Sequence, residues 1–178
     1  SEHMKSRILS INKKFLLNEL ENLDVLVVPG FQGINERREI TTLGRGGSDT
    51  SAVAVAAAMD AECIIYTDVE GVFTTDPNIV PNAKKINKIS YEEMLELASQ
   101  GAKVLQTRSV ELAMRKNTKL SVRSSLKPKK IGTIITDEKS VLEKNTVSGI
   151  AYTKDEAKIT LSRVLAVSYT HLRAHETS

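Results

Sequence analysis

The sequence predicts an α/β fold: a mainly parallel sheet with helices on both faces. Two observations indicate this. Short apolar runs typical of buried strands alternate with segments whose apolar side chains recur at helical spacing. Glycine, proline and small polar residues follow these runs and mark the loops between them. With 178 residues, the chain is long enough for one medium domain, or for one domain and part of another.

The first part of the chain predicts a helix, a strand and a loop. Apolar residues fall at helical spacing within 11–22, which predicts a helix. The run D-V-L-V-V-P-G at 24–30 predicts a buried strand, parallel to its neighbours, that enters a loop. Residues 31–44 are polar and contain glycine, as in a loop or a small hairpin.

An alanine-rich helix and a second strand come next. Alanine has the highest helix propensity, so we expect a helix from 49 to about 59. Thr50 or Ser51 is the expected N-cap. The segment A-E-C-I-I-Y-T-D at 61–68 predicts another buried strand.

The following residues predict a loop, two helices and a strand. Residues 69–81 contain Gly and Pro and are expected to form a loop. Ser90 followed by Glu93 has the capping-box pattern of a helix start, and Gly101 lies beyond the end of that helix. A second helix, 106–117, leads into a strand at 119–125.

The character of the sequence changes after 132–136, and we place a domain boundary near residue 140. Residues 5–139 form the predicted main domain, and 140–166 the start of another, with two short strands in 147–161. We interpret 167–178 as a non-native tail because it has neither helical nor strand periodicity. The opening S-E-H-M resembles residues left by an expression vector.

Composition argues against several classes of function. The net charge is +3 and the basic clusters lack interleaved aromatic residues, so we expect no nucleic-acid partner. The sequence contains no apolar run of membrane-spanning length and no signal peptide pattern, so we expect no membrane partner and a cytoplasmic protein. The three histidines lie near the termini, which disfavours Ser-His-Asp catalysis and a histidine-rich metal site. The single cysteine, Cys63, is expected to be buried and reduced.

The stretch T-T-L-G-R-G-G-S-D-T-S at 41–51 is the first candidate site. Gly46 and Gly47 allow close approach of a ligand to the backbone, and the helix start that follows favours an anion. Arg45 adds a cation suited to a carboxylate or phosphate, and Asp49 suits an ammonium, a lysine or a metal. These elements fit a zwitterion held beside a phosphate group. The alternative is a structural turn in which Arg45 and Asp49 pair with each other.

Two further candidates lie downstream. Thr67 and Asp68 end the second predicted strand, at the edge where ligands bind in parallel sheets. The alternative is an ordinary junction between strand and loop. Lys103, in G-A-K-V-L, could reach a phosphate, or it could be a solvated lysine.

Four segments together resemble the aspartokinases: T-L-G-R-G-G-S-D-T-S-A, Y-T-D-V-E-G-V-F-T-T-D-P, I-S-Y-E-E-M-L-E-L-A-S-Q-G-A-K-V-L and V-R-S-S. The resemblance runs from about residue 7 to 161, and V-S-G-I-A-Y-T-K-D-E-A-K-I-T-L resembles the opening of the family's regulatory ACT domain. It implies an amino-acid kinase-like fold, of which this chain holds the C-terminal, nucleotide-binding half. It also implies transfer of the γ-phosphoryl group of ATP to the side-chain carboxylate of L-aspartate, as the first step towards lysine, threonine and methionine.

The resemblance also implies roles for individual residues. Arg45 and Ser48, with Gly46 and Gly47, bind aspartate, and Phe31 lines that pocket. Asp49 organises the reacting centre. Residues expected at the nucleotide are Thr67, Asp68, Phe73, Asn78 and Lys103, and Lys103 reaches the phosphates. Mg²⁺ is expected to arrive with ATP, because the sequence contains no preformed metal cluster.

Several departures from the family pattern qualify this expectation. The family's amino-terminal half, with its K-F-G-G-T motif, and the rest of the ACT region are missing, so we expect little or no kinase activity from the isolated chain. In the family the ACT region binds effectors and builds a homo-oligomer. Asn78 replaces a usual arginine, and Phe73 a frequent tyrosine. The alternatives are another amino-acid kinase, such as one similar to glutamate 5-kinase, or a non-catalytic nucleotide-binding or regulatory polypeptide.

Overall fold

The computed structural model describes residues 6–102, 104–137 and 149–151. In chain order the elements are α1 (Lys13–Leu20), β1 (Gln32–Ile34), β2 (Ile40–Thr42), α2 (Gly47–Met59), β3 (Cys63–Thr67), β4 (Lys88–Ser90), α3 (Tyr91–Ser99), α4 (Thr107–Lys116), β5 (Leu120–Ser124) and β6 (Thr133–Thr136). The alternation of strands and helices is therefore the predicted one over most of the described chain. The predicted boundary near residue 140 lies outside the described residues.

The main sheet has four strands in the order β3-β5-β6-β4. The β3–β5 and β4–β6 pairs are parallel, and the central β5–β6 pair is antiparallel. The two parallel pairings confirm a mainly parallel sheet. In this register Cys63, Leu120 and Ile135 lie in one row, and all three are buried in the core.

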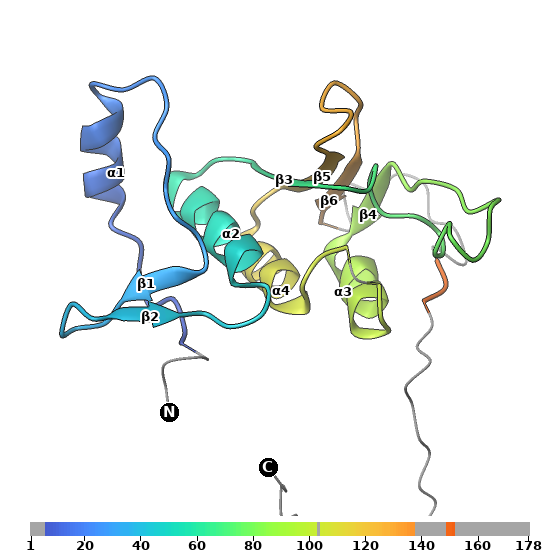
Figure 1. Ribbon diagram of the computed structural model, residues 1–178, viewed down its shortest axis with the longest axis horizontal. Helices are drawn as coiled ribbons and strands as arrows, with labels where there is room; N and C mark the ends of the chain where they lie inside the picture. The colour runs from blue at the N-terminus through green and yellow to red at the C-terminus, as the bar shows by residue number, and fades with distance from the viewer. Residues whose placement is uncertain (1–5, 103, 138–148, 152–178) are drawn as a thin grey trace, which may run out of the picture.

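Helices α2, α4 and α3 lie side by side against this sheet (Figure 1). They bury Val53, Val110 and Met94 against the strand residues of the core. The three helices pack on the same face of the sheet; α3 and α4 each have one apolar side, whereas α2 is rich in alanine and valine on most of its surface.

The opposite face of the sheet differs from the prediction of helices on both faces. Ile64 and Tyr66 of β3 point to that face and are 38% and 51% exposed. The physical reason is that α2, α3 and α4 bury their side chains in one shared core, and the fourth described helix, α1, contributes no residue to that core. The strand predicted at 61–68 is thus buried on one side only.

The predicted strand at 24–30 is wrong for this structure. Val25 and Val27 are 74% and 87% exposed, and in the described part of the chain this run pairs with no other strand. A strand becomes stable only when its N–H and C=O groups meet those of a neighbour, and an apolar run alone does not provide one. The predicted hairpin is confirmed, because β1 and β2 form a two-stranded antiparallel ribbon.

The start of α2 also differs from the prediction. The helix begins at Gly47, and its N-cap is Gly46, whose φ of 71° lies in the left-handed region. Thr50 and Ser51, the predicted caps, lie inside the helix and donate their hydroxyl groups to the carbonyl oxygens of Gly46 and Gly47. The prediction for α3 is confirmed, since Ser90 and Glu93 form a complete capping box. No helix in the described ranges is both long and apolar enough to cross a membrane.

Candidate functional site

The loop before α2 holds Phe31 against the helix start. The Phe31 N–H donates to Ser51 Oγ at 3.1 Å, and Gly30 packs against Ser48. A Cβ on Gly47 would lie only 3.0 Å from Phe31 Cδ2. Phe31 itself has a φ of 68°, which is rare for a bulky side chain and is often found at functional sites. The structure therefore brings together the predicted substrate residues Phe31, Gly47 and Ser48.

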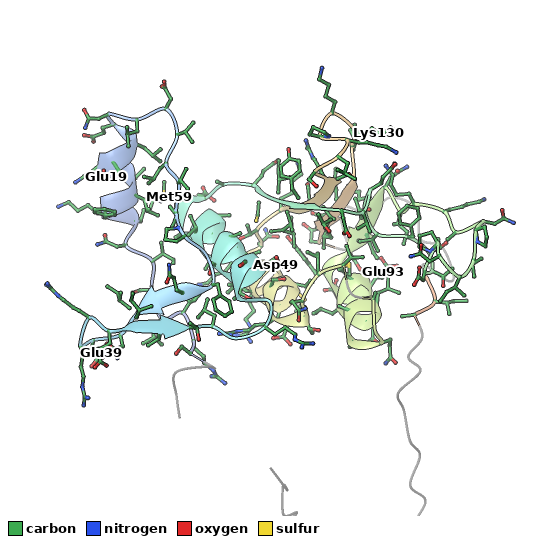
Figure 2. All side chains as sticks on the ribbon, in the orientation of Figure 1. Glu19, Glu39, Asp49, Met59, Glu93 and Lys130 are labelled. Atoms are coloured by element: carbon green, nitrogen blue, oxygen red, sulfur yellow. The ribbon has the colours of Figure 1, made fainter. Side chains whose placement is uncertain are left out.

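Arg45 is exposed at this loop, and Asp49 is partly buried in the first turn of α2. Among the described residues Arg45 makes no ion pair with Asp49, contrary to the purely structural alternative. Burial raises the pKa of the Asp49 carboxyl group, and a hydrogen bond from the Gln106 backbone N–H partly offsets this. The Arg45 guanidinium is thus left available for a ligand, while the carboxylate faces α4 (Figure 2).

Gly46 brings the starts of α2 and α4 into contact. A Cβ on Gly46 would lie 2.6 Å from Gln106 Cβ, well inside van der Waals contact. Gln106 is the N-cap of α4 and also donates to Asp49. The loop at residues 44–46, called the anion loop below, is therefore held against the N-cap of α4. Lys103 occurs in the sequence shortly before this N-cap. Lys103 itself lies outside the described residues.

A cavity of ≈ 680 Å³ lies beyond the end of β3. Its lining residues come from the end of β3, the loop that follows, the end of α3 and the segments 101–104 and 150–151: Thr67, Asp68, Val69, Gly71, Val72, Phe73, Thr75, Asp76, Pro77, Asn78, Leu97, Gly101, Ala102, Val104, Ile150 and Ala151. The volume is in the range of small-molecule and cofactor sites. All four predicted nucleotide residues in the described chain, Thr67, Asp68, Phe73 and Asn78, lie on its wall.

The loop of this cavity is held by strand β6. The Val72 N–H donates to Thr133 Oγ1 at 2.8 Å, and Thr133 Oγ1 in turn donates to the Ile86 carbonyl at 2.5 Å. Gly71, with a φ of 146°, passes so close that a Cβ would lie 2.6 Å from Thr133 Oγ1. Only glycine fits this approach, so the shape of the loop depends on a fully buried threonine remote in sequence.

The polar end of the cavity carries carboxylates. Thr67 Oγ1 donates to Asp68 Oδ1 at 3.0 Å, and the Asn78 N–H donates to Asp76 Oδ1 at 2.9 Å. Glu70, beside the cavity loop, pairs with Lys127 and Lys130 of the β5–β6 turn, and the hydrogen bond from Lys127 lowers the pKa of Glu70. Because Asp68 and Asp76 both line the cavity, they could contact a metal ion that a phosphate ligand brings with it.

The segment 101–106 connects the two candidate sites. Gly101, Ala102 and Val104 line the cavity, and Gln106 contacts both Gly46 and Asp49. A ligand in the cavity and a ligand at the anion loop would therefore share this segment as a common border.

Several residues of the site were missed by sequence reasoning. Gln106, Thr133, Leu97 and Ile150 act through contacts with residues distant in the sequence, so no local pattern marks them. Arg108 is a fifth case: its guanidinium donates to the carbonyl oxygens of Leu43 and Ser6 at 3.0 and 2.8 Å, which anchors the strand before the anion loop. The sequence offers one signal for Arg108, which lies in the first turn of the helix predicted at 106–117.

The fold and these two sites define an α/β protein with a cavity at the carboxyl end of a strand and an arginine-bearing glycine loop at the start of a helix. The amino acid kinase family model matches residues 3–124, and the chain belongs to this family. This confirms the family predicted from the sequence motifs.

Relatives with similar sequences carry a more particular name. An aspartate kinase of Pseudomonas putida is 54% identical over 166 residues, which are 92% of this chain and 40% of that protein. An aspartokinase of Pseudomonas aeruginosa is 52% identical over 167 residues, with the same shares of the two chains. The chain thus spans about 40% of the length of the curated relatives it matches.

Solved structures of aspartate kinases are similar to this chain as well. The aspartate kinase of Clostridium acetobutylicum has a TM-score of 0.69 at 31% identity, over 78% of this chain and 33% of that one. Aspartokinase III of E. coli, in complex with aspartate and ADP, has a TM-score of 0.62 at 41% identity, over 68% of this chain and 27% of that one. These similarities support the amino-acid kinase fold.

Proposed function

We propose that this chain is the nucleotide-binding part of an aspartate kinase. The reaction transfers the γ-phosphoryl group of ATP to the side-chain carboxylate of L-aspartate and gives 4-phospho-L-aspartate and ADP. The observation that carries the proposal is that the cavity at the end of β3 and the loop at Arg45 border on the same residues before α4. Gly101, Ala102 and Val104 line the cavity, and Gln106 contacts Gly46. Within the described part of the chain Arg45 makes no ion pair. The names of the relatives, and the aspartate and ADP bound in aspartokinase III, support it.

The proposed roles of the site residues follow from their charge and position. Arg45 and Ser48 hold the aspartate carboxylate, with Gly46, Gly47 and Phe31 shaping the pocket. Thr67, Asp68, Phe73 and Asn78 hold the nucleotide, and Lys103 neutralises its phosphates. Mg²⁺ would enter with ATP, and Asp68 and Asp76 are the carboxylates of the cavity wall that could hold it.

The chemistry places few demands on a general base. The attacking group is a carboxylate, which already carries its negative charge, so catalysis rests on positioning and on charge neutralisation. This suits Asp49, whose carboxylate accepts a hydrogen bond from the Gln106 backbone N–H and so acts as a positioning group for the start of α4.

Further properties are proposed for the whole protein. They are a role in the biosynthesis of lysine, threonine and methionine, a homo-oligomer built through an ACT region, and a location in the cytoplasm. The one free cysteine of the described chain, buried in β3, fits a reducing compartment.

The decisive experiment is a coupled ADP-release assay on the longest reading frame that contains this chain, with aspartate and glutamate compared. We expect turnover with aspartate and far less with glutamate. Turnover with glutamate alone would support the other amino-acid kinases, and no turnover with either would reject the proposal.

The Arg45→Ala variant tests the assignment of the anion loop in the same assay. We expect the KM for aspartate to rise at least tenfold, because a charge-assisted pair is lost, while the KM for ATP changes less than about threefold. Arg37→Ala, on the exposed β1–β2 turn, is the control and should change neither. Equal rises in both KM values for Arg45→Ala would contradict the assignment.

A further inference from the structure

Residues 149–151 return to the cavity loop although they are far from it in the sequence. The Ile150 N–H donates to the Thr74 carbonyl at 2.7 Å. The Thr74 N–H donates to the Lys84 carbonyl at 2.8 Å, so the backbone of Thr74 is bonded on both sides. Its neighbours Phe73 and Thr75 line the cavity. Ile150 thus holds the cavity loop at the point between two of its lining residues.

Gly149 allows this segment to lie close to the loop. A Cβ at this position would lie 3.1 Å from both the Thr74 carbonyl oxygen and Leu97 Cδ2. Leu97 also lines the cavity, and Ala151 packs against the core. The three residues are therefore seated by a backbone hydrogen bond and by packing at both ends.

The side chains of this segment supply an apolar wall. Ile150 and Ala151 line the cavity together with the apolar residues Leu97 and Val104, and the carboxylates of Asp68 and Asp76 belong to the same wall. The Ile150 side chain is 67% exposed, so a flat ligand on this wall would remove much of its apolar surface from water. A nucleobase is the flat, largely apolar part of a nucleotide, and the nucleotide's phosphates carry Mg²⁺, which the carboxylates of Asp68 and Asp76 could hold.

We propose that residues 149–151 form one wall of the nucleotide cavity. Ile150 packs on the base, and its N–H acts as the positioning group for the loop around Thr74. This inference rests on the proposed nucleotide-binding function. Binding is reciprocal: if nucleotide affinity depends on the seating of this segment, then nucleotide also fixes the segment in place.

The test is calorimetry of the whole chain with Mg²⁺ and a non-hydrolysable ATP analogue. Ile150→Ala keeps the N–H but removes the apolar wall, and Ile150→Pro also removes the donor. We expect affinity to fall about threefold to tenfold for Ile150→Ala and further for Ile150→Pro, because a lost apolar contact or hydrogen bond has effects of this size. Ile131→Ala is the matched control, since Ile131 is 69% exposed and lies outside the cavity lining.

Hydrogen exchange gives a second readout on the unaltered chain. The Ile150 amide should exchange more slowly when the analogue is bound, whereas the amide of Ile131 should not change. Hydrogen exchange on the unaltered chain still tests the inference if circular dichroism shows that Ile150→Pro does not fold.

The outcomes separate the inference from the function on which it rests. Binding by the unaltered chain with equal affinity in Ile150→Ala and Ile150→Pro, and no slowing at Ile150, overturns the inference alone. No heat and no change in exchange with the analogue overturns the nucleotide cavity of this chain, and the inference with it.

Discussion

Gly46 shows how a single residue controls the candidate site. Gly46 has a φ of 71°, and it also lies in close contact with Gln106. For both reasons, any residue with a Cβ would be strained at this position. The neighbouring Phe31 pays a similar conformational cost at a φ of 68° with a full side chain. Gly46 and Phe31 both have left-handed backbones and both contact the start of α2. The loop therefore keeps a particular shape although this shape lowers its stability.

Gly46→Ala should destabilise the chain by about 1–3 kcal/mol, from the left-handed backbone and the contact with Gln106. For a chain of this size, that lowers Tm by about 2–4 °C per kcal/mol. Gly33→Ala is the matched control, because a Cβ there meets no atom within 4 Å. Differential scanning calorimetry of both variants measures the effect, and equal Tm values for the two would contradict this account of Gly46.

Cys63 offers a test of pH dependence at the same scale. Burial, with a smaller contribution from the negative charge of Asp49, raises the pKa of its thiol from 9.0 to about 11. Between these two values the native state keeps a proton that the unfolded state has lost, so the free energy of unfolding decreases as pH rises from 9 to 11. Urea unfolding at pH 8 and pH 10.5 should show a larger loss for the unaltered chain than for Cys63→Ala.

Asp49→Asn should reduce that alkaline loss, since it removes the charge that helps to raise the thiol pKa. Asp60→Asn is the control, because Asp60 lies at the other end of α2 and asparagine tolerates its left-handed φ of 56°. An identical loss in Asp49→Asn and in the unaltered chain would mean that the Asp49 charge does not act on Cys63.

At the scale of elements, local patterns were reliable wherever an element carries its own stabilising contacts. Helix α3 is the clearest case: Ser90 Oγ accepts from the Glu93 N–H at 3.1 Å, and the Glu93 carboxylate accepts from the Ser90 N–H at 3.0 Å. Both bonds lie within one helical turn, so the sequence contains everything needed to predict them. The start of α2 has no such side-chain cap, and its predicted N-cap was wrong.

Ser90→Ala should therefore lower the free energy of unfolding by about 1 kcal/mol, the usual effect of losing an N-cap side chain. Ser99→Ala, at the exposed end of the same helix, should change it by less than about 0.5 kcal/mol. Urea titrations of the two variants give the comparison. A Ser99→Ala effect as large as that of Ser90→Ala would count against the capping box as the source.

For the whole molecule, the exposed apolar residues are as informative as the core. Val25, Val27 and Val28 precede the β1–β2 ribbon, and Ile64 and Tyr66 lie on the uncovered face of the main sheet. Exposed apolar side chains at these two places favour association with other protein surfaces. The chain spans about 40% of the length of the curated relatives it matches.

Val27→Lys should leave the free energy of unfolding of this chain within about 0.5 kcal/mol, because the side chain is 87% exposed. The same change should reduce association of the chain in sedimentation experiments, since charge interrupts an apolar surface. Val53→Ala, in the core, is the contrasting variant and should cost about 1–3 kcal/mol. A comparable cost for Val27→Lys would mean that residues 24–30 are buried as a strand after all.

The family, the order of most elements and four residues of the cavity wall, Thr67, Asp68, Phe73 and Asn78, could be predicted from the sequence, because each depends on sequence motifs or on contacts within a few residues. The start of α2, the exposure of residues 24–30, and the parts played by Gln106, Thr133 and Ile150 were decided only by the tertiary structure. These depend on which distant backbone and side-chain groups meet, and hydrogen bonds and close packing are satisfied by position in space rather than by distance along the chain.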